Sequence, residues 1–318
     1  MNRRTRLLVG ALGRLPKPEP PTTAYLVGVR RELPRALARV VLGPLGREVD
    51  VDDLSVPVDG ARLRVRLYRR QGAPARVPLV VNFHGGGFVY GNLTSADWIC
   101  GNLAARTGLM VASVDYRLAP EHPAPIPFQD CWAATRWLVE HADRLGADRD
   151  DVTVMGESAG GNLAALVALA NRDRRRAEPD WPALTHQVLL YPITDLTLAS
   201  PSIDELPDAP ILPRTSLDWF GRRYVPQGLP SSLAPDDPLV SPLYAPDKTD
   251  LPPALVIAAG QDPLRDDALR YADALAEAGV PVRRVVYPDA IHGFASIPLF
   301  EPAAHAALAE VVTELTAR

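Results

Sequence analysis

Short apolar runs alternate with longer amphipathic segments along most of this chain. Six runs of six to eight residues are rich in β-branched side chains and lack a polar face, which is typical of parallel strands buried on both faces of a sheet. They are PLVVNF (78–83), LMVASVDY (109–116), DVTVMG (151–156), HQVLLY (186–191), PALVIAAG (253–260) and VRRVVYPD (282–289). An earlier segment, ARLRVRLY at 61–68, alternates strictly and predicts a half-solvated strand near a sheet edge.

Helical periodicity fills the intervals between these runs. After DVTVMG, the residues Leu163, Leu166 and Val167 recur at the spacing that places them on one helix face. Helices are predicted over 95–107, 128–145, 159–170, 266–278 and 302–315. Strands that alternate with helices indicate an α/β fold, with a central, mostly parallel β-sheet flanked by helices.

Two segments do not follow this alternation. One is the first 45 residues, and the other is a proline-rich stretch directly after HQVLLY. Connections of this length usually form lids or binding loops. We therefore expect N-terminal cap helices in residues 1–45 and a cap insertion at 193–252, which separates the two parts of the core, 46–192 and 253–318.

The composition and charge argue against several kinds of partner and site. A chain of 318 residues with 47% hydrophobic residues can bury a large core, and a net charge of −4 offers no basic footprint for nucleic acid. The two cysteines, Cys100 and Cys131, and six histidines show no ligand spacing, so no disulfide, metal or cofactor is predicted. The apolar stretch 7–13 is too short for a signal peptide or membrane span, so we expect an amphipathic helix, a cytoplasmic location and no stable membrane association.

A serine framed by glycines gives the first chemical signal. The segment Gly156-Glu157-Ser158-Ala159-Gly160 fits G-x-S-x-G, which arises by chance about 0.1 times in a chain of this length. Here it lies between a predicted strand and a predicted helix, the setting of a nucleophile elbow, although an ordinary strand-to-helix turn is the alternative. Amides at a helix N-terminus favour developing negative charge, so the Ala159 amide is a candidate oxyanion donor beside a nucleophilic Ser158.

A serine nucleophile needs a base and an orienting acid, expected in the chain order Ser, acid, His. Asp262 follows PALVIAAG and His292 follows VRRVVYPD, so both are expected at carboxyl ends of strands, where the sites of α/β sheets gather. A structural loop histidine is the alternative for His292. Asp266 and Asp289 are the alternative acids, but Asp266 fits a helix N-cap better and Asp289 fits a turn.

Three consecutive glycines after PLVVNF are candidates for the second oxyanion donor that a serine hydrolase needs. Gly85, Gly86 and Gly87 stand where a second oxyanion donor is needed, and the sequence does not decide which of their amides donate. The preceding His84 is interpreted as a brace for this loop, and Glu121 and Asp130 as structural ion-pair or capping residues. Candidate substrate-binding residues are Phe88, Ile211, Leu212, Trp219 and Phe220, with a small cap core around Trp219, Phe220 and Tyr224 as the alternative.

Together these motifs resemble the bacterial hormone-sensitive-lipase-like esterases of the α/β-hydrolase fold. In family order and spacing the chain has HGGGF from His84, DYRLAPEHPAPIPFQD from Asp115, GESAGGNLAA from Gly156, YPITDLT from Tyr191, DPLRDD from Asp262 and HGF from His292. The resemblance extends from Arg47 to the C-terminus. It implies an α/β-hydrolase fold whose helical cap is formed by the N-terminus and an insertion after the sixth strand. It also implies Ser158, Asp262 and His292 as a catalytic triad, and an oxyanion hole from Ala159 and the glycine run.

The same resemblance implies a serine carboxylesterase. The expected substrates are short- to medium-chain carboxylic esters, hydrolysed through an acyl-enzyme by a monomer or homodimer. The same triad would also serve an amidase, a lactonase or an acyltransferase acting on a specialised metabolite. A non-enzymatic small-molecule receptor is disfavoured, because receptors of this fold lack the histidine that His292 supplies.

One residue departs from the family pattern. The family more often has aspartate before the nucleophile, whereas this chain has Glu157, as in longer carboxylesterases that use a glutamate as the triad acid. Glu157 is not expected to be the acid, because adjacent side chains at an elbow point in different directions. We expect it to support the structure beneath the elbow.

Overall fold

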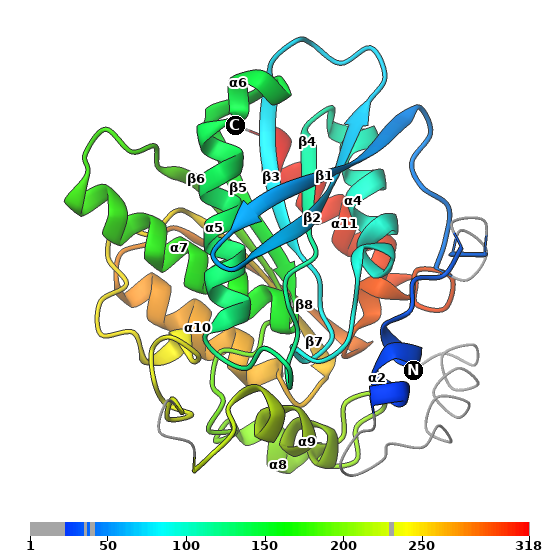
Figure 1. Ribbon diagram of the computed structural model, residues 1–318. Helices are drawn as coiled ribbons and strands as arrows, with labels where there is room; N and C mark the ends of the chain where they lie inside the picture. Colours follow the sequence, from blue (N-terminus) through cyan, green and yellow to red (C-terminus); the bar gives the residue numbers. More distant parts are fainter. Residues whose placement is uncertain (1–22, 35–36, 39–41, 229–231, 318) are drawn as a thin grey trace.

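The computed structural model contains one eight-stranded sheet with helices on both faces (Figure 1). It describes residues 23–34, 37–38, 42–228 and 232–317. The strand order is β1-β2-β4-β3-β5-β6-β7-β8. The first two strands, β1 (Val49–Val58) and β2 (Ala61–Arg70), are antiparallel, and all neighbours from β4 to β8 are parallel. The predicted α/β fold with a mostly parallel sheet is therefore confirmed.

The six apolar runs form the six remaining strands. These are β3 (Val77–Phe83), β4 (Met110–Val114), β5 (Ala147–Glu157), β6 (Leu184–Leu190), β7 (Ala254–Gln261) and β8 (Val282–Ile291). Alternate residues of a central strand face two separate cores: Leu79 and Val81 of β3 pack in one core and Val80 in the other. This two-sided burial explains why the central runs have no polar face.

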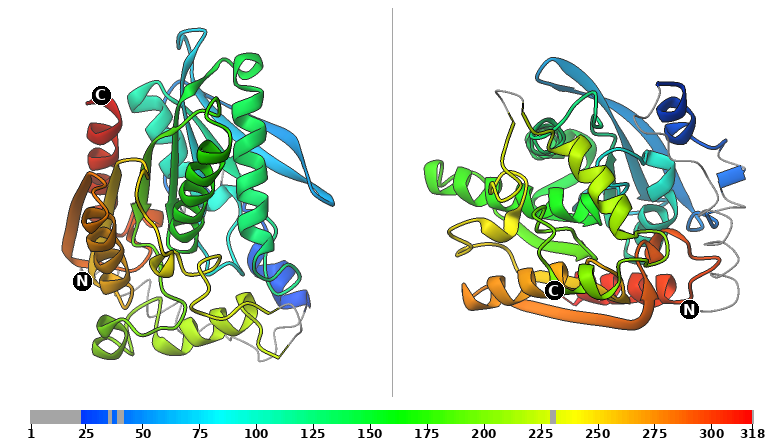
Figure 2. Two further views of the ribbon diagram at one scale, coloured as in Figure 1. Left: turned by 90° about the vertical axis from the view of Figure 1, so that its left-hand side faces the viewer. Right: turned by 90° about the horizontal axis from the view of Figure 1, so that it is seen from below.

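Helices cover both faces of the sheet (Figure 2). On one face lie α5 (Ile126–Glu140), α7 (Ala159–Ala177) and α10 (Arg265–Glu277), and on the other α4 (Leu93–Thr107) and α11 (Ala303–Thr316). The helix predicted over 128–145 is divided at His141 into α5 and the short α6 (Ala142–Leu145). The other predicted helices are present, with ends that differ by up to a few residues except at α7, which is longer than predicted.

Some predictions about individual strands are wrong. The run that forms β8 is not buried on both faces, because β8 is the outermost strand and Val286 is exposed. The alternation in 61–68 predicts that Arg62, Arg64 and Arg66 share a solvated face, but Arg66 is buried and pairs with Asp53 on β1 and Asp97 on α4. Asp289 lies within β8 and not in a turn.

The helices that follow β6 lie beyond one end of the sheet, close to α2 (Thr23–Arg30), as Figure 1 shows. They are α8 (Pro201–Glu205) and α9 (Arg214–Tyr224), followed by the 3₁₀ helix η1 (Pro242–Tyr244). The helix predicted around residues 7–13 lies outside the described residues. A second 3₁₀ helix, η2 (Phe294–Ser296), follows β8 directly.

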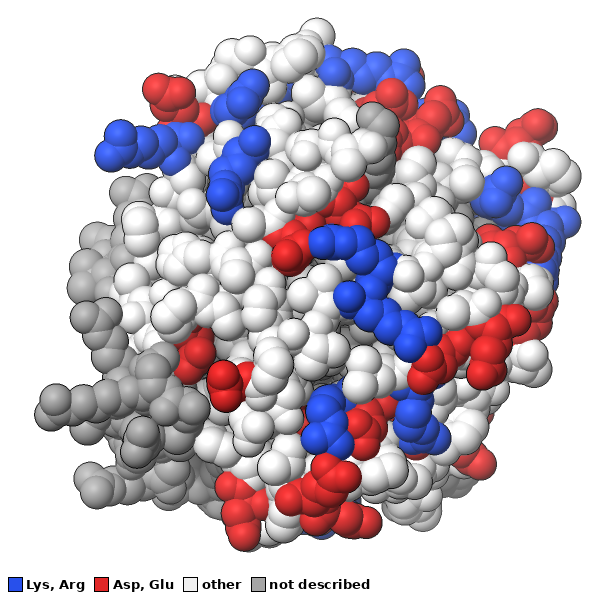
Figure 3. Space-filling model, turned by 180° about the vertical axis from the view of Figure 1, so that it is seen from behind, with Lys and Arg blue, Asp and Glu red and all other residues white. Residues whose placement is uncertain are grey.

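Both signs of charge are interspersed on the face seen in Figure 3. The two basic residues of β8 are paired with acids: Arg283 pairs with Glu310 and Glu314 on α11, and Arg284 pairs with Asp273 on α10. This face therefore has no extended region of positive charge. Among the described residues, no helix is both long and apolar enough to cross a membrane.

Candidate active site

Ser158 occupies a sharp turn between β5 and α7. Its backbone has φ 55° and ψ −120°, a conformation that is strained for any residue with a side chain. The turn requires glycine on both sides, because a Cβ on Gly156 would lie 2.1 Å from the Gly160 carbonyl oxygen and one on Gly160 only 1.9 Å from the Phe83 oxygen. Since α7 begins at Ala159, that residue's amide is one of the helix N-terminal donors without a helical partner.

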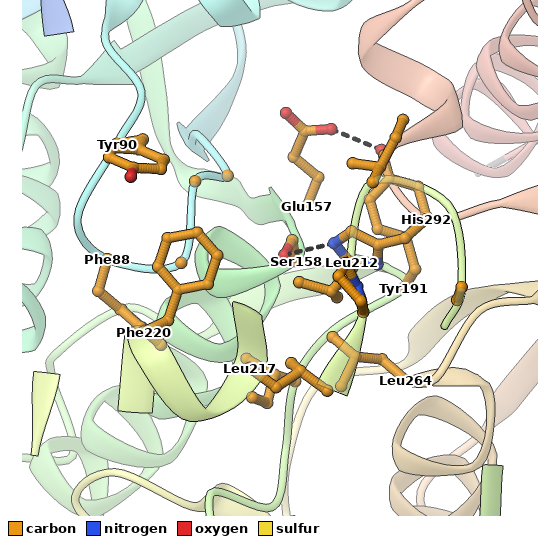
Figure 4. Close-up of a pocket in the computed structure, with 18 of the residues that line it drawn as sticks. Phe88, Tyr90, Glu157, Ser158, Tyr191, Leu212, Leu217, Phe220, Leu264 and His292 are labelled. Carbon is orange, nitrogen blue, oxygen red and sulfur yellow. Dashed lines mark hydrogen bonds between the residues drawn. The ribbon is translucent and has the colours of Figure 1, made fainter. Parts of the chain in front are cut away.

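Ser158, His292 and Asp262 form one chain of hydrogen bonds, and Figure 4 shows the link between Ser158 and His292. Ser158 Oγ lies 2.8 Å from His292 Nε2, and His292 Nδ1 lies 2.8 Å from Asp262 Oδ2. Asp262 is fully buried after β7, and its Oδ1 accepts the Leu264 amide at 2.9 Å. The ends of β5, β7 and β8 thus bring the three predicted residues together.

The alternative acid Asp266 has other contacts. It lies inside the first turn of α10, whose N-cap position is Leu264, so the N-cap prediction is wrong. Its carboxylate accepts the Ser202 amide at 2.9 Å and pairs with Arg265 at 2.7 Å. Asp266 therefore stabilises the start of α10.

The glycine run after β3 borders the same cavity as Ser158. Gly86 and Gly87 have φ values of 124° and 60°, and the loop closes through the Val89 and Tyr90 amides, which donate to the Gly86 oxygen at 3.1 and 2.8 Å. A Cβ on Gly87 would lie 2.5 Å from the Phe220 ring. Glycine therefore allows both the left-handed turn and the close approach of Phe220 from α9.

His84 stabilises this loop through its buried side chain. It is fully buried, its ring stacks on Tyr116 at 4.4 Å between centroids, and Nδ1 donates to the Gly85 oxygen at 2.8 Å. Burial lowers the pKa of His84, which favours a neutral ring. Tyr116 also donates its hydroxyl to the His84 carbonyl oxygen at 2.7 Å, so the loop is held at two points.

A cavity of about 860 Å³ lies over Ser158. Of the predicted substrate-binding residues, Phe88, Ile211, Leu212 and Phe220 line it. Trp219 does not: it is buried on α9, where the Arg223 guanidinium lies 3.8 Å from the centroid of its ring. Neighbouring residues of α9 point in different directions, so only one of this aromatic pair reaches the cavity. Further lining residues, not predicted from the sequence, include Tyr25, Tyr90, Tyr191, Ile193, Leu196, Asp208, Leu217 and Leu264.

Glu157 joins the elbow to two neighbouring segments. Its Oε2 accepts the hydroxyl of Tyr191, at the end of β6, and that of Ser296, in η2, each at 2.5 Å. Burial and the adjacent carboxylate raise the pKa of Tyr191, so this phenol remains a donor. No local spacing in the sequence indicates these contacts, because the partners are 34 and 139 residues away.

The other ionisable residues of the motifs make structural contacts. Glu121 pairs with Arg30 of α2 at 3.0 Å, and the buried Asp130 pairs with Arg117 at 2.6 Å. Within the described ranges, no three His, Cys, Asp or Glu side chains are grouped so that they could hold a metal ion. The two cysteine thiols are buried and not bonded to each other.

A nucleophile elbow after a central strand, with its partners at the ends of later strands, defines the class of α/β hydrolases. Consistent with this, a family model described as alpha/beta hydrolase fold matches residues 80–296. The chain belongs to this family and, within it, to the bacterial hormone-sensitive-lipase-like esterases.

Similar proteins include both sequence relatives and solved structures. Esterase LipI of Mycobacterium tuberculosis is 40% identical over 277 residues, which cover 86% of this chain and 82% of LipI. An ethyl acetate hydrolase of Pseudomonas putida is 40% identical over 247 residues, 77% of this chain and 75% of the relative. The hyperthermophilic esterase of the archaeon Pyrobaculum calidifontis has a TM-score of 0.85 at 34% identity, covering 100% of this chain and 98% of its own. The chain is accordingly a carboxylic ester hydrolase.

Proposed function

We propose that ester hydrolysis uses Ser158 as the nucleophile, His292 as the base and Asp262 as the orienting acid. The observation that carries this proposal is the hydrogen-bond chain, with 2.8 Å at both links. A serine hydroxyl is a weak nucleophile, so His292 Nε2 takes its proton as Oγ attacks the ester carbonyl carbon. Buried Asp262 holds the tautomer with the proton on Nδ1 and stabilises the imidazolium that forms.

The tetrahedral intermediate places a negative charge on the former carbonyl oxygen. We assign its donors to the Ala159 amide and to amides of the Gly85–Gly87 run, which borders the cavity. Loss of one such donor typically costs about 3–4 kcal/mol of transition-state stabilisation. As the intermediate collapses, His292 gives its proton to the leaving alcohol, and an acyl-enzyme on Ser158 remains. Water, deprotonated by His292, then attacks the acyl carbon and releases the acid.

The cavity supports uncharged esters with short to medium acyl chains. Its volume of about 860 Å³ lies within the range of small-molecule sites, and aromatic and aliphatic side chains form most of its wall. Two carboxylates border it: that of Glu157 is already bonded to two hydroxyls, and that of Asp208 belongs to a residue exposed to solvent. An apolar acyl group would therefore replace water against the wall without leaving a charge unpaired.

The test compares wild type with Ser158→Ala on nitrophenyl esters of increasing acyl length, and uses a phosphonate probe to locate the reactive residue by mass spectrometry. Ser158→Ala should lose about 10⁴-fold or more in kcat and should not be labelled. Ser55→Ala, at an exposed serine on β1, is the matched control and should retain full activity. Undiminished hydrolysis by Ser158→Ala, or a label on another residue, would refute the assignment. Faster acyl transfer to an added alcohol or amine than to water would instead favour an acyltransferase.

A further inference from the structure

A fully buried carboxylate lies outside the hydrogen-bond chain of Ser158. Asp267, in the first turn of α10, accepts the amides of Thr194 at 2.8 Å and Asp195 at 3.0 Å through Oδ2. Its Oδ1 accepts the hydroxyl of Ser200. All three donors are buried and belong to the first residues of the segment that leaves the sheet after β6. Asp267 therefore fastens the root of this segment to α10.

Further polar contacts join the same two stretches, 194–205 and 262–270, which we call the cap-root seam. Ser202 Oγ donates to the Pro263 oxygen at 2.5 Å, next to Asp262. The Arg270 guanidinium donates to Asp195 at 2.9 Å and to Ser200 Oγ at 2.8 Å. The seam is thus a continuous polar network, and Asp267 is its central acceptor.

The charged groups around Asp267 are consistent with its role as the central acceptor. Burial raises the pKa of Asp267 to about 7, the three donors oppose that rise, and the nearby Asp195 adds to it. Asp195 is itself neutralised by Arg270 from α10 and accepts the Tyr244 hydroxyl from η1. The acidic residues of α8, Asp204 and Glu205, pair with Arg214 and Arg265. A carboxyl group at this depth persists in a fold when several donors converge on it.

The seam connects two walls of the cavity. Leu264 lies between Asp262 and Asp267 and lines the cavity from one side. Ile193 and Leu196 line it from the root of the cap segment. The close-up shows Leu264 beside Leu217 and Leu212, on the side of Ser158 away from Tyr90 (Figure 4). Movement along the seam would therefore change the aliphatic part of the wall.

We propose that Asp267 is a positioning residue of the esterase, which holds Ile193 and Leu196 against Leu264 and so sets the preference for longer acyl chains. This inference rests on the proposed function of Ser158. A long acyl group contacts the aliphatic wall, whereas an acetyl group is confined to the surroundings of Ser158 and the glycine run. Loosening the seam should therefore raise KM for long-chain esters and leave kcat for acetate esters nearly unchanged.

The experiment measures kcat and KM for nitrophenyl acetate and nitrophenyl octanoate in Asp267→Ala, Asp267→Asn and wild type. Asp267→Ala should raise KM for the octanoate by about three- to tenfold, with less than about a twofold change in kcat for the acetate. Asp267→Asn keeps an oxygen for the Thr194 and Asp195 amides and should restore the wild-type KM. Asp273→Ala, on the exposed side of α10, is the matched control and should behave as wild type.

Ser200→Ala removes a single donor and provides the test if Asp267→Ala does not fold. It should change KM for the octanoate in the same direction, by about twofold or more. Unchanged KM values in variants that the phosphonate probe still labels at Ser158 would overturn the inference, and so would an equal effect of Asp267→Asn and Asp267→Ala. Absence of any label at Ser158 in wild type would instead refute the proposed function.

Discussion

Replacement of Glu157 by alanine should lower stability far more than turnover. The change removes the carboxylate that accepts hydroxyls from Tyr191 and Ser296, each at 2.5 Å, and leaves the fully buried Tyr191 hydroxyl without this partner. Hydrogen bonds to a charged group contribute about 1.5–3 kcal/mol each, so the expected loss is about 3–6 kcal/mol. With an unfolding entropy of about 2.1 cal/mol/K per residue over 318 residues, this corresponds to a Tm lower by about 4–9 °C.

The assay combines calorimetry with initial rates measured well below the transition. Active sites are counted with the phosphonate probe, so that kcat refers to folded enzyme only. Tyr191→Phe and Ser296→Ala each remove one of the two hydrogen bonds and should each give roughly half of the effect on Tm. Glu157→Asp should retain most of the activity, because a shorter carboxylate still accepts hydroxyls.

Glu157 is expected to support the fold around the elbow and not to take part in the reaction. The residue contacts the elbow's neighbours and not the hydrogen-bond chain of Ser158, so kcat per labelled site should fall by less than about tenfold in Glu157→Ala. An unchanged Tm together with a much larger fall in kcat would refute this reasoning. Glu157 would then act on the reacting groups themselves.

Three further predictions concern Gly160, Gly221 and Asp267. Gly160→Ala should prevent folding, because its Cβ would lie 1.9 Å from the Phe83 oxygen, whereas Gly221→Ala, in a helix with open space around it, should raise the free energy of unfolding by about 0.5–1 kcal/mol. Soluble expression and urea unfolding check both, and a folded Gly160→Ala would contradict the first. Because burial raises the pKa of Asp267 from 3.8 to about 7, the folded state binds more protons than the unfolded state between these values. This contribution to stability is therefore complete below about pH 4 and is lost as the pH rises to about 7. Relative to Asp267→Asn, wild type should lose about 3 kcal/mol between pH 5 and pH 8 in urea unfolding, and a difference that is independent of pH would contradict this assignment.

Chain order and local periodicity predicted most of the architecture. Central strands such as β3 and β7 are recognisable because burial on both faces leaves an uninterrupted apolar run, and α7 because one face repeats at helical spacing. The strand β1 was not predicted, since its sequence VDVDDLSVPV contains no apolar run and its side chains are mostly exposed or half-buried. A strand of this kind is defined by its pairing with β2 and not by its own composition.

The sequence by itself determined the identity and order of the chemical groups: Ser158 between two required glycines, and Asp262 and His292 after later strands. These signals are local, because a tight turn or a strand end constrains the residues at that position. Only the tertiary structure decided which partners meet across the fold. It placed Phe220 against Gly87 and buried Trp219 away from the cavity. It also buried Arg66 between two acids and gave Glu157 and Asp267 their distant donors. Such contacts join residues that are far apart in the chain, so no local spacing in the sequence predicts them.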